Sequence, residues 1–269
     1  MGTDITTTIS LTIPDLGKLA LTFSDQGNGH VFLLLHGGGG PLTVDGFAAQ
    51  LAAAELGARA ITPIHPGFNG TPRPAALDDV PGLAQLYIEL LEALAVDHVT
   101  VVGNSIGGWL AAEMAVLGSP RASGYVIVDG IGIEVPGHPL ADFSSLTPAE
   151  VAQHTFHDPE RFGIDPSSLP PEAQSGMQIN RATLAVYAGA GMSDPTLAAR
   201  LGNVTAPALV LWGEADRIAD PDYGQAFADA IPGARFGLLN ACGHLPQIEA
   251  PEAVLEAITT FAEQTTGQI

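Results

Sequence analysis

The sequence feature that most constrains the fold is the segment at residues 99 to 118, which reads VTVVGNSIGGWLAAEMAVLG. A run of Val and Thr, typical of a buried strand, is followed by GNSIGG and then by strong helix formers from Trp109 onward. When a strand turns abruptly into a helix, the residue at the apex is strained, and side chains two positions away on either side would clash. Because glycine stands at both positions, 103 and 107, the segment predicts a strand–turn–helix unit that holds the Ser105 hydroxyl clear of its own backbone.

The rest of the chain alternates between short apolar runs and helical patterns. The predicted strands are 31–35, 59–63, 124–128, 208–211 and 234–239, with one more beginning at Val99. The predicted helices are 47–56, 83–94, 109–117, 222–230 and one from Pro251. Two alternating stretches, 6–13 and 18–24, joined by a turn at 14–17, predict an antiparallel entry into the sheet. The order predicts an α/β fold: a mostly parallel sheet with helices on both faces.

One block, residues 134–201, breaks this alternation. It contains several prolines and only short helical patterns, such as the capping box from Thr147 to Glu150, and it has no persuasive strand pattern. An insertion between two sheet strands would lie over the carboxyl ends of the sheet, where open α/β folds bind their ligands. We therefore predict a core domain of residues 1–133 and 202–269 with a helical cap at 134–201.

Composition restricts the partners of this chain. With 269 residues and 46% hydrophobic content, it can bury one large core. Its 29 acidic and 9 basic residues give a formal charge of −20, which would repel nucleic acid and anionic membrane surfaces. The single cysteine, Cys242, cannot form an intramolecular disulfide. Without a signal-like N-terminus or a membrane-length apolar run, the protein is expected in the cytoplasm, away from membranes and nucleic acid.

A serine nucleophile needs a base, usually histidine, and the histidine needs a carboxylate to fix its tautomer. The segment ALVLWGEADR at residues 208–217 places Asp216 just past a predicted strand, and NACGHLPQIE at 240–249 places His244 after the next one. The predicted triad is therefore Ser105, Asp216 and His244, all at one edge of the sheet. Asp220 and Asp129, which ends the strand YVIVD, are alternative acids.

The segment LLLHGGGGPL supplies a glycine turn directly after a buried strand. Backbone N–H groups there can stabilise an oxyanion, and we predict the N–H of Gly38 as one donor, with Gly39 possible. The second predicted donor is the N–H of Ile106, the residue after the nucleophile. His36 is interpreted as a structural residue that holds the turn. The histidines lack metal-ligand spacing, so no metal and no cofactor is predicted.

Residues of the predicted cap and of the helix after Ser105 are candidates for contact with a substrate. The candidates are Gly39, Trp109, Phe143 and Tyr187, with Phe156, Phe162, Met177 and Met192 as further side chains that could shape an apolar pocket. Arg181 is a scarce cation in this acidic chain. It could bind a substrate carboxylate or form a structural ion pair.

Four motifs in this order resemble the α/β-hydrolase superfamily over nearly the whole chain: the HGGGG turn, GNSIGG, GEAD at 213–216 and GHLP at 243–246. The loop HPGFNGTPRP at 65–74 is also similar to a Pro-Gly-Phe loop of cofactor-free bacterial esterases. The turn and GNS are similar to C–C bond hydrolases of ring-fission products, but Gly40 and Leu245 stand where those enzymes usually carry Pro and Trp. Dehalogenases and epoxide hydrolases carry aspartate in place of Ser105.

The sequence therefore predicts a cofactor-independent serine hydrolase with an α/β-hydrolase fold. It would cleave a small, fairly apolar carboxylic ester or lactone through an acyl-enzyme on Ser105. Two alternatives remain: a C–C bond hydrolase or lyase using the same triad, and a hydrolase-like ligand receptor with little turnover.

Overall fold

The computed structural model describes residues 5–13, 17–54, 57–142 and 146–266. They form an eight-stranded sheet in the order β1-β2-β4-β3-β5-β6-β7-β8. The strands are β1 (Ile5–Ile13), β2 (Gly17–Gly27), β3 (His30–Leu35), β4 (Ala58–Pro63), β5 (Val99–Asn104), β6 (Ala122–Val128), β7 (Ala208–Gly213) and β8 (Arg235–Leu239). Strand β2 pairs antiparallel with β1 and β4, and all other neighbours are parallel. Most of the predicted turn at 14–17 lies outside the described residues.

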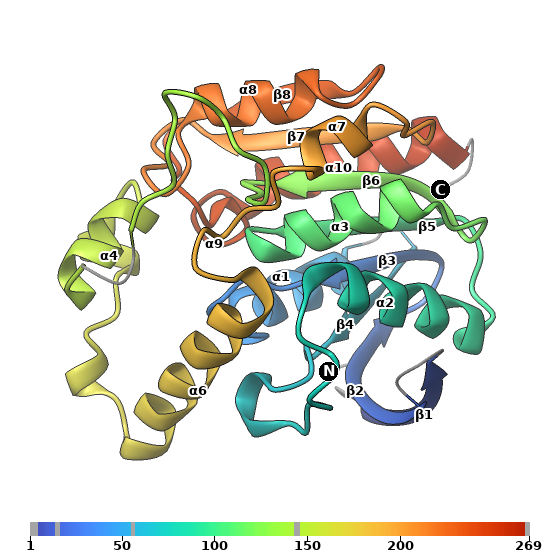
Figure 1. Cartoon of the computed structure of the whole chain (residues 1–269), viewed down its shortest axis with the longest axis horizontal. Helices are drawn as coiled ribbons and strands as arrows, with labels where there is room; N and C mark the ends of the chain where they lie inside the picture. Colours follow the sequence, from blue (N-terminus) through green and yellow to red (C-terminus); the bar gives the residue numbers. More distant parts are fainter. Residues whose placement is uncertain (1–4, 14–16, 55–56, 143–145, 267–269) are drawn as a thin grey trace.

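Helices cover both faces of the sheet, as predicted (Figure 1). The helices of the core are α1 (Leu42–Ala53), α2 (Val80–Leu94), α3 (Ile106–Leu117), α8 (Pro221–Asp229), α9 (Pro246–Glu249) and α10 (Pro251–Thr266). On one face α1 and α10 bury Phe47 and Phe261 against the strands. On the other, α2, α3 and α8 bury side chains such as Leu90, Leu110 and Phe227. The predicted α/β fold with a mostly parallel sheet is confirmed.

The segment between β6 and β7 is helical. Its elements are α4 (Pro148–Thr155), α5 (Pro159–Phe162), the 3-10 helix η2 (Pro166–Ser168), α6 (Pro171–Ala188) and α7 (Leu197–Leu201). In Figure 1, α4 and α6 stand beyond the arrowheads of the strands, at the carboxyl edge of the sheet. Helix α7 differs from them, because Leu197 and Leu201 are buried in the core cluster. The capping box starts α4 as predicted, with the Thr147 side chain accepting from the Glu150 N–H.

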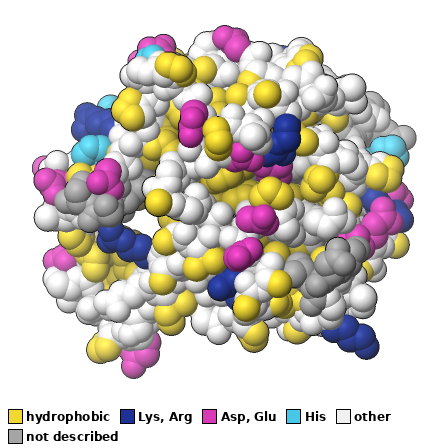
Figure 2. Space-filling view, in the orientation of Figure 1, with side chains coloured by type: hydrophobic (Ala, Val, Ile, Leu, Met, Phe, Trp, Pro, Cys, Tyr) yellow, Lys and Arg dark blue, Asp and Glu magenta, His cyan; other side chains and the backbone are white. Residues whose placement is uncertain are grey.

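The surface agrees with the acidic composition. Acidic side chains are scattered over the face shown in Figure 2 rather than gathered in one patch. Among the helices built from described residues, none is both long enough and apolar enough to cross a membrane.

The turn between β5 and α3 has the strained geometry that the sequence predicts. Ser105 has φ 59° and ψ −120°, a conformation that side-chain-bearing residues rarely adopt. The neighbouring strand holds it, since the Ser105 N–H donates to the Val128 carbonyl at 3.1 Å. A Cβ atom on Gly103 would lie 1.9 Å from the Gly107 oxygen, and one on Gly107 would lie 2.1 Å from the Leu35 oxygen. Both glycines are therefore required by close backbone approach.

Replacing the second of these glycines tests the packing directly. Gly107→Ala forces a methyl group against the β3 backbone, which cannot move without disturbing the sheet. We expect a loss of about 2 kcal/mol or more in the free energy of unfolding, measured by chemical denaturation. The matched control is Gly176→Ala in α6, where a Cβ atom meets nothing within 4 Å. There the higher helix propensity of alanine should leave stability unchanged or raised by about 0.5–1 kcal/mol. Equal stability of the two variants would contradict this account of the turn.

Candidate active site

Asp216 and His244 meet at the carboxyl edge of the sheet, on the loops that follow β7 and β8. The Asp216 Oδ1 atom accepts from the N–H groups of Ile218 at 2.8 Å and Ala219 at 3.3 Å, which fixes the carboxylate. Its Oδ2 atom lies 2.8 Å from His244 Nδ1. Because an ionised carboxylate only accepts hydrogen bonds, Nδ1 must carry the proton, and Nε2 is left as the basic nitrogen.

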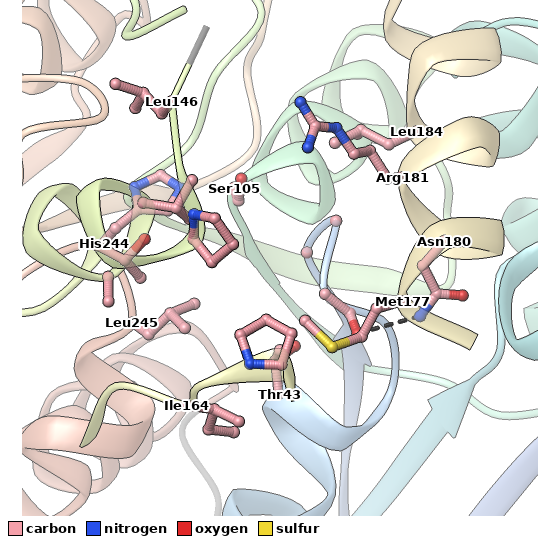
Figure 3. Close-up of a pocket in the computed structure, with 18 of the residues that line it drawn as sticks. Thr43, Ser105, Leu146, Ile164, Met177, Asn180, Arg181, Leu184, His244 and Leu245 are labelled. Atoms are coloured by element: carbon pink, nitrogen blue, oxygen red, sulfur yellow. Dashed lines mark hydrogen bonds between the residues drawn. The ribbon is translucent and has the colours of Figure 1, made fainter. Parts of the chain in front are cut away.

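The Nε2 atom of His244 forms no hydrogen bond with any described residue. His244 is 5% exposed, and its Nε2 atom is buried without a hydrogen-bond partner among the described residues. The imidazole and Ser105 line the same cavity (Figure 3). The backbone of the histidine is also fixed, since its N–H donates to the Thr155 carbonyl at 2.7 Å. The structure thus brings the three predicted triad residues together: Asp216 is hydrogen-bonded to His244, and His244 and Ser105 line one cavity, although Nε2 forms no hydrogen bond to a described residue.

The predicted oxyanion donors lie in the turn after β3 and at the start of α3, on either side of Ser105. Gly38 and Gly39 line the cavity in the turn after β3. Ile106 is the first residue of α3, where a backbone N–H has no acceptor within its own helix. These positions suit the binding of a developing negative charge next to Ser105.

Two histidines, His36 and His65, stack beside the glycine turn, with ring centroids 3.7 Å apart. The Nδ1 atom of His36 lies 2.8 Å from the Gly37 carbonyl, and its Nε2 atom accepts from the His65 N–H at 3.1 Å. Burial lowers the pKa of His36 to about 4, so the ring is neutral at physiological pH. The ring is fully buried, in agreement with the structural role predicted from the sequence.

We call the helical segment between β6 and β7 the insertion. A cavity of about 510 Å³ lies between the core loops and the insertion. In Figure 2 the molecule is hollowed between the α4 and α6 parts. The apolar lining residues are Leu146, Pro148, Val151, Ala152, Phe156, Ile164, Pro166, Met177, Leu184, Met192 and Leu245. Phe156, Met177 and Met192, which the sequence predicts as pocket residues, line this cavity. Phe162 does not line it and stacks on Phe156 instead, with ring centroids 6.1 Å apart. Arg181 also lines the cavity, on α6 (Figure 3).

The predicted substrate contacts of Trp109 and Tyr187 are wrong, because neither side chain reaches this cavity. Trp109 is 3% exposed and donates its indole N–H to the Glu113 carboxylate at 3.2 Å. Tyr187 is equally buried and donates its hydroxyl to the Pro66 carbonyl at 2.8 Å. Both rings pack in the interior instead. Phe143 lies outside the described residues.

Asn104 is a site residue that sequence reasoning missed. Its amide nitrogen donates to the His244 carbonyl at 2.9 Å and to the Val128 carbonyl at 3.2 Å, and its oxygen accepts from Gln247. The side chain therefore connects the loop of His244 to the turn of Ser105. A signal was present, since a buried amide at the end of an apolar strand must find partners.

Two polar side chains, Asn180 of the insertion and Glu249 of the core helix α9, connect the insertion to the site. Asn180 on α6 donates to the Gly39 carbonyl at 3.2 Å and accepts from the Asn69 N–H at 2.7 Å. Glu249 accepts from the Gly243 N–H at 2.6 Å and from the N–H groups that follow α4, at residues 157 and 158. The glycine turn and the histidine loop are thus each bonded to the insertion. Sequence carried no signal for the contact of Asn180 with Gly39, because the two residues are distant along the chain.

The alternative acids have other positions. Asp220 caps α8 through the Tyr223 N–H at 2.9 Å and pairs with His138 at 2.8 Å. Asp129 lies beside the triad, where one of its oxygens, one of Asp216 and a ring nitrogen of His244 lie within 4.8 Å of one another. That spacing could also hold a metal ion. An ion bound through Nδ1 would have to replace the hydrogen bond between His244 and Asp216, so metal removal is a direct test.

The model of the alpha/beta hydrolase family matches residues 32–257. The chain belongs to this family. The 2-hydroxy-6-oxo-6-phenylhexa-2,4-dienoate hydrolase of Burkholderia cepacia is 29% identical, over 88% of this chain and 89% of the relative. The 2-hydroxymuconate semialdehyde hydrolase of Pseudomonas putida is 28% identical, over 92% and 94%. A thermophilic esterase from Thermogutta terrifontis has a TM-score of 0.75 at 22% identity, covering 96% of this chain and 99% of that one, a likeness of fold alone.

Substitutions of the triad should show one shared mechanism. Ser105→Ala and His244→Ala should each lower kcat on an activated short-chain ester by about 10⁴-fold or more, and the double variant should be hardly worse, because the residues act as a unit. Asp216→Asn should cost about 10⁴-fold through the wrong histidine tautomer. Steady-state kinetics measures all four variants. Losses that multiply in the double variant would contradict a shared mechanism.

Removal of metal ions separates a triad from a metal site. We expect kcat/KM to be unchanged after exhaustive chelation and gel filtration, because the Nδ1 proton already occupies the space between His244 and Asp216. A parallel sample supplied with divalent ions is the control. Activity that disappears on chelation and returns with an added ion would place the ion, rather than this hydrogen bond, at the centre of the site.

Proposed function

We propose that this chain is a serine hydrolase that cleaves a small, largely apolar carboxylic ester or lactone through an acyl-enzyme on Ser105. The observation that carries the proposal is the buried Nε2 atom of His244, which has no partner in the described structure and lines the same cavity as Ser105. Asp216 holds the opposite ring nitrogen at 2.8 Å. This arrangement supports a base that is oriented before substrate binds.

The proposed reaction has two halves. His244 Nε2 takes the Ser105 proton while Oγ attacks the acyl carbon, and the N–H groups of Gly38 and Ile106 hold the oxyanion. When the carbon–oxygen bond of the ester breaks, the leaving alkoxide takes the proton from His244. Water then gives a proton to His244 and attacks the acyl-enzyme, and the acid departs as Ser105 recovers its proton.

The substrate class follows from the walls of the cavity. Its volume of about 510 Å³ lies within the usual range for small-molecule sites, and most of its lining side chains are apolar. The insertion supplies many of them, including Val151, Met177 and Leu184. We infer that the part from α4 to α6 acts as a cap that binds the acyl or alcohol group and excludes water from the reacting carbonyl.

Carbon–carbon bond hydrolysis is a second candidate, favoured by the curated relatives. Their names describe hydrolysis of dienoates or a semialdehyde, and a dienoate of the kind named for the Burkholderia cepacia enzyme contains no ester bond. The same nucleophile, base and oxyanion donors could serve that reaction at a ketone carbon. Arg181 on the cavity wall could then bind the carboxylate of such a substrate.

A substrate panel tests the proposal. We expect purified protein to release product from short-chain esters and lactones in large excess over the enzyme concentration, with a transient acyl adduct on Ser105 in intact-protein mass spectrometry. Ser105→Ala should form neither product nor adduct. Faster turnover of 2-hydroxy-6-oxodienoates than of every ester would favour the second candidate. An adduct that persists, with product ending at one equivalent on all substrates, would instead indicate a receptor.

A further inference from the structure

We propose that Asp129 is a positioning residue that stays protonated in the active protein and donates a hydrogen bond from its carboxyl group to Asp216. This inference rests on the proposed function, since it assigns Asp216 to the triad. It differs from the alternative in which Asp129 is itself the catalytic acid.

The surroundings of Asp129 leave one of its oxygens without a donor. Its Oδ1 atom accepts from the Gly213 N–H at 2.8 Å, at the end of β7. The residue is fully buried, and its Oδ2 atom has no hydrogen-bond partner among the described residues. One carboxyl oxygen of Asp129, one of Asp216 and a ring nitrogen of His244 lie within 4.8 Å of one another. A buried polar atom without a partner is costly, and a proton on Oδ2 would give it one.

The hydrogen bonds of the two carboxyl groups decide where the proton lies. Asp216 accepts from two backbone N–H groups, of Ile218 and Ala219, and lies 2.8 Å from the Nδ1 atom of His244. Three donors stabilise its charged form. Asp129 receives one donor, from Gly213. Since two neighbouring buried carboxylates cannot both be charged cheaply, the proton belongs on Asp129.

The titratable groups around Asp129 agree with this assignment. Burial raises the pKa of Asp129 well above its ordinary value. The charge of Asp216 is the second cause, and the charge of Glu249 raises the pKa further. Cys242 also lies near these acids, and burial raises the pKa of its thiol to about 12, so the thiol is neutral and adds no further negative charge.

The backbone at residues 128 and 129 lies between the turn of Ser105 and strand β7. The Asp129 N–H donates to the Leu211 carbonyl at 3.0 Å, while the preceding residue, Val128, accepts from the Ser105 N–H at 3.1 Å. The Asp129 φ of 45° is a second strained position at this edge of the sheet. Val128 and Asp129 together therefore connect the turn of Ser105 to the end of β7. The Asp129 proton would orient the Asp216 carboxylate toward His244 without adding a second negative charge.

Infrared spectroscopy tests the protonation state without any substrate. At a pH where exposed carboxyl groups are ionised, we expect the carbonyl stretch of one protonated carboxylic acid, shifted by ¹³C labelling of aspartate and absent from Asp129→Asn. The Ser105→Ala protein should keep the band. If no such band is present, Asp129 is charged and the proposal is overturned. This measurement can fail while ester hydrolysis succeeds, and the reverse, so the two proposals are tested separately.

Matched substitutions test the positioning role. Asp129→Leu removes both polar atoms at similar size, and we expect kcat to fall about ten- to a hundredfold with little change in KM. Asparagine reproduces one acceptor and one donor of a protonated acid, so Asp129→Asn should regain most of that loss, whereas Asp216→Asn should not. Circular dichroism identifies a variant that fails to fold, and the infrared band still decides in that case. A loss in Asp129→Asn as large as in Asp216→Asn, or full activity in Asp129→Leu, would overturn the proposal.

Discussion

The whole site depends on the strained backbone of Ser105, at the point where β5 becomes α3. Its φ of 59° is sustained because β5 is paired on both sides and because the adjoining β6 accepts its N–H at 3.1 Å. The same turn places Ile106 at the start of a helix, where its N–H is unsatisfied within that helix. One local conformation thus places the Ser105 hydroxyl next to the N–H group that we propose as an oxyanion donor, and Gly103 and Gly107 leave room for it.

Around that turn, buried polar groups connect loops that are far apart along the chain. Asn104 bonds the histidine loop to the strand that supports Ser105, and Asp129 bonds the end of β6 to the end of β7. Such networks raise the cost of any misplaced partner, because an unpaired polar group in a low-dielectric interior is expensive. The network therefore favours one arrangement of the site over others with equal apolar packing.

The insertion combines two tasks. Its apolar side chains form much of the wall of the cavity, while Asn180 and the Thr155 carbonyl bond directly to the glycine turn and to the backbone of His244. The wall of the cavity and the position of the His244 backbone therefore depend on the same segment. Since the fold of the alpha/beta hydrolase family supports many reactions, differences in this segment are where substrate choice is expected to arise.

Sequence by itself determined the parallel sheet, the strained serine turn and the chain order of Ser105, Asp216 and His244. These follow from local rules: hydrophobic period, glycine where backbones approach, and the meeting of parallel strand ends at one edge. Only the tertiary structure decided which acid pairs with His244, namely Asp216. It also decided the interior positions of Trp109 and Tyr187 and the contacts of Asn180. Each of these depends on which distant segments come within hydrogen-bonding or packing distance, and that distance is set by how the helices and the insertion pack rather than by any pattern within one segment.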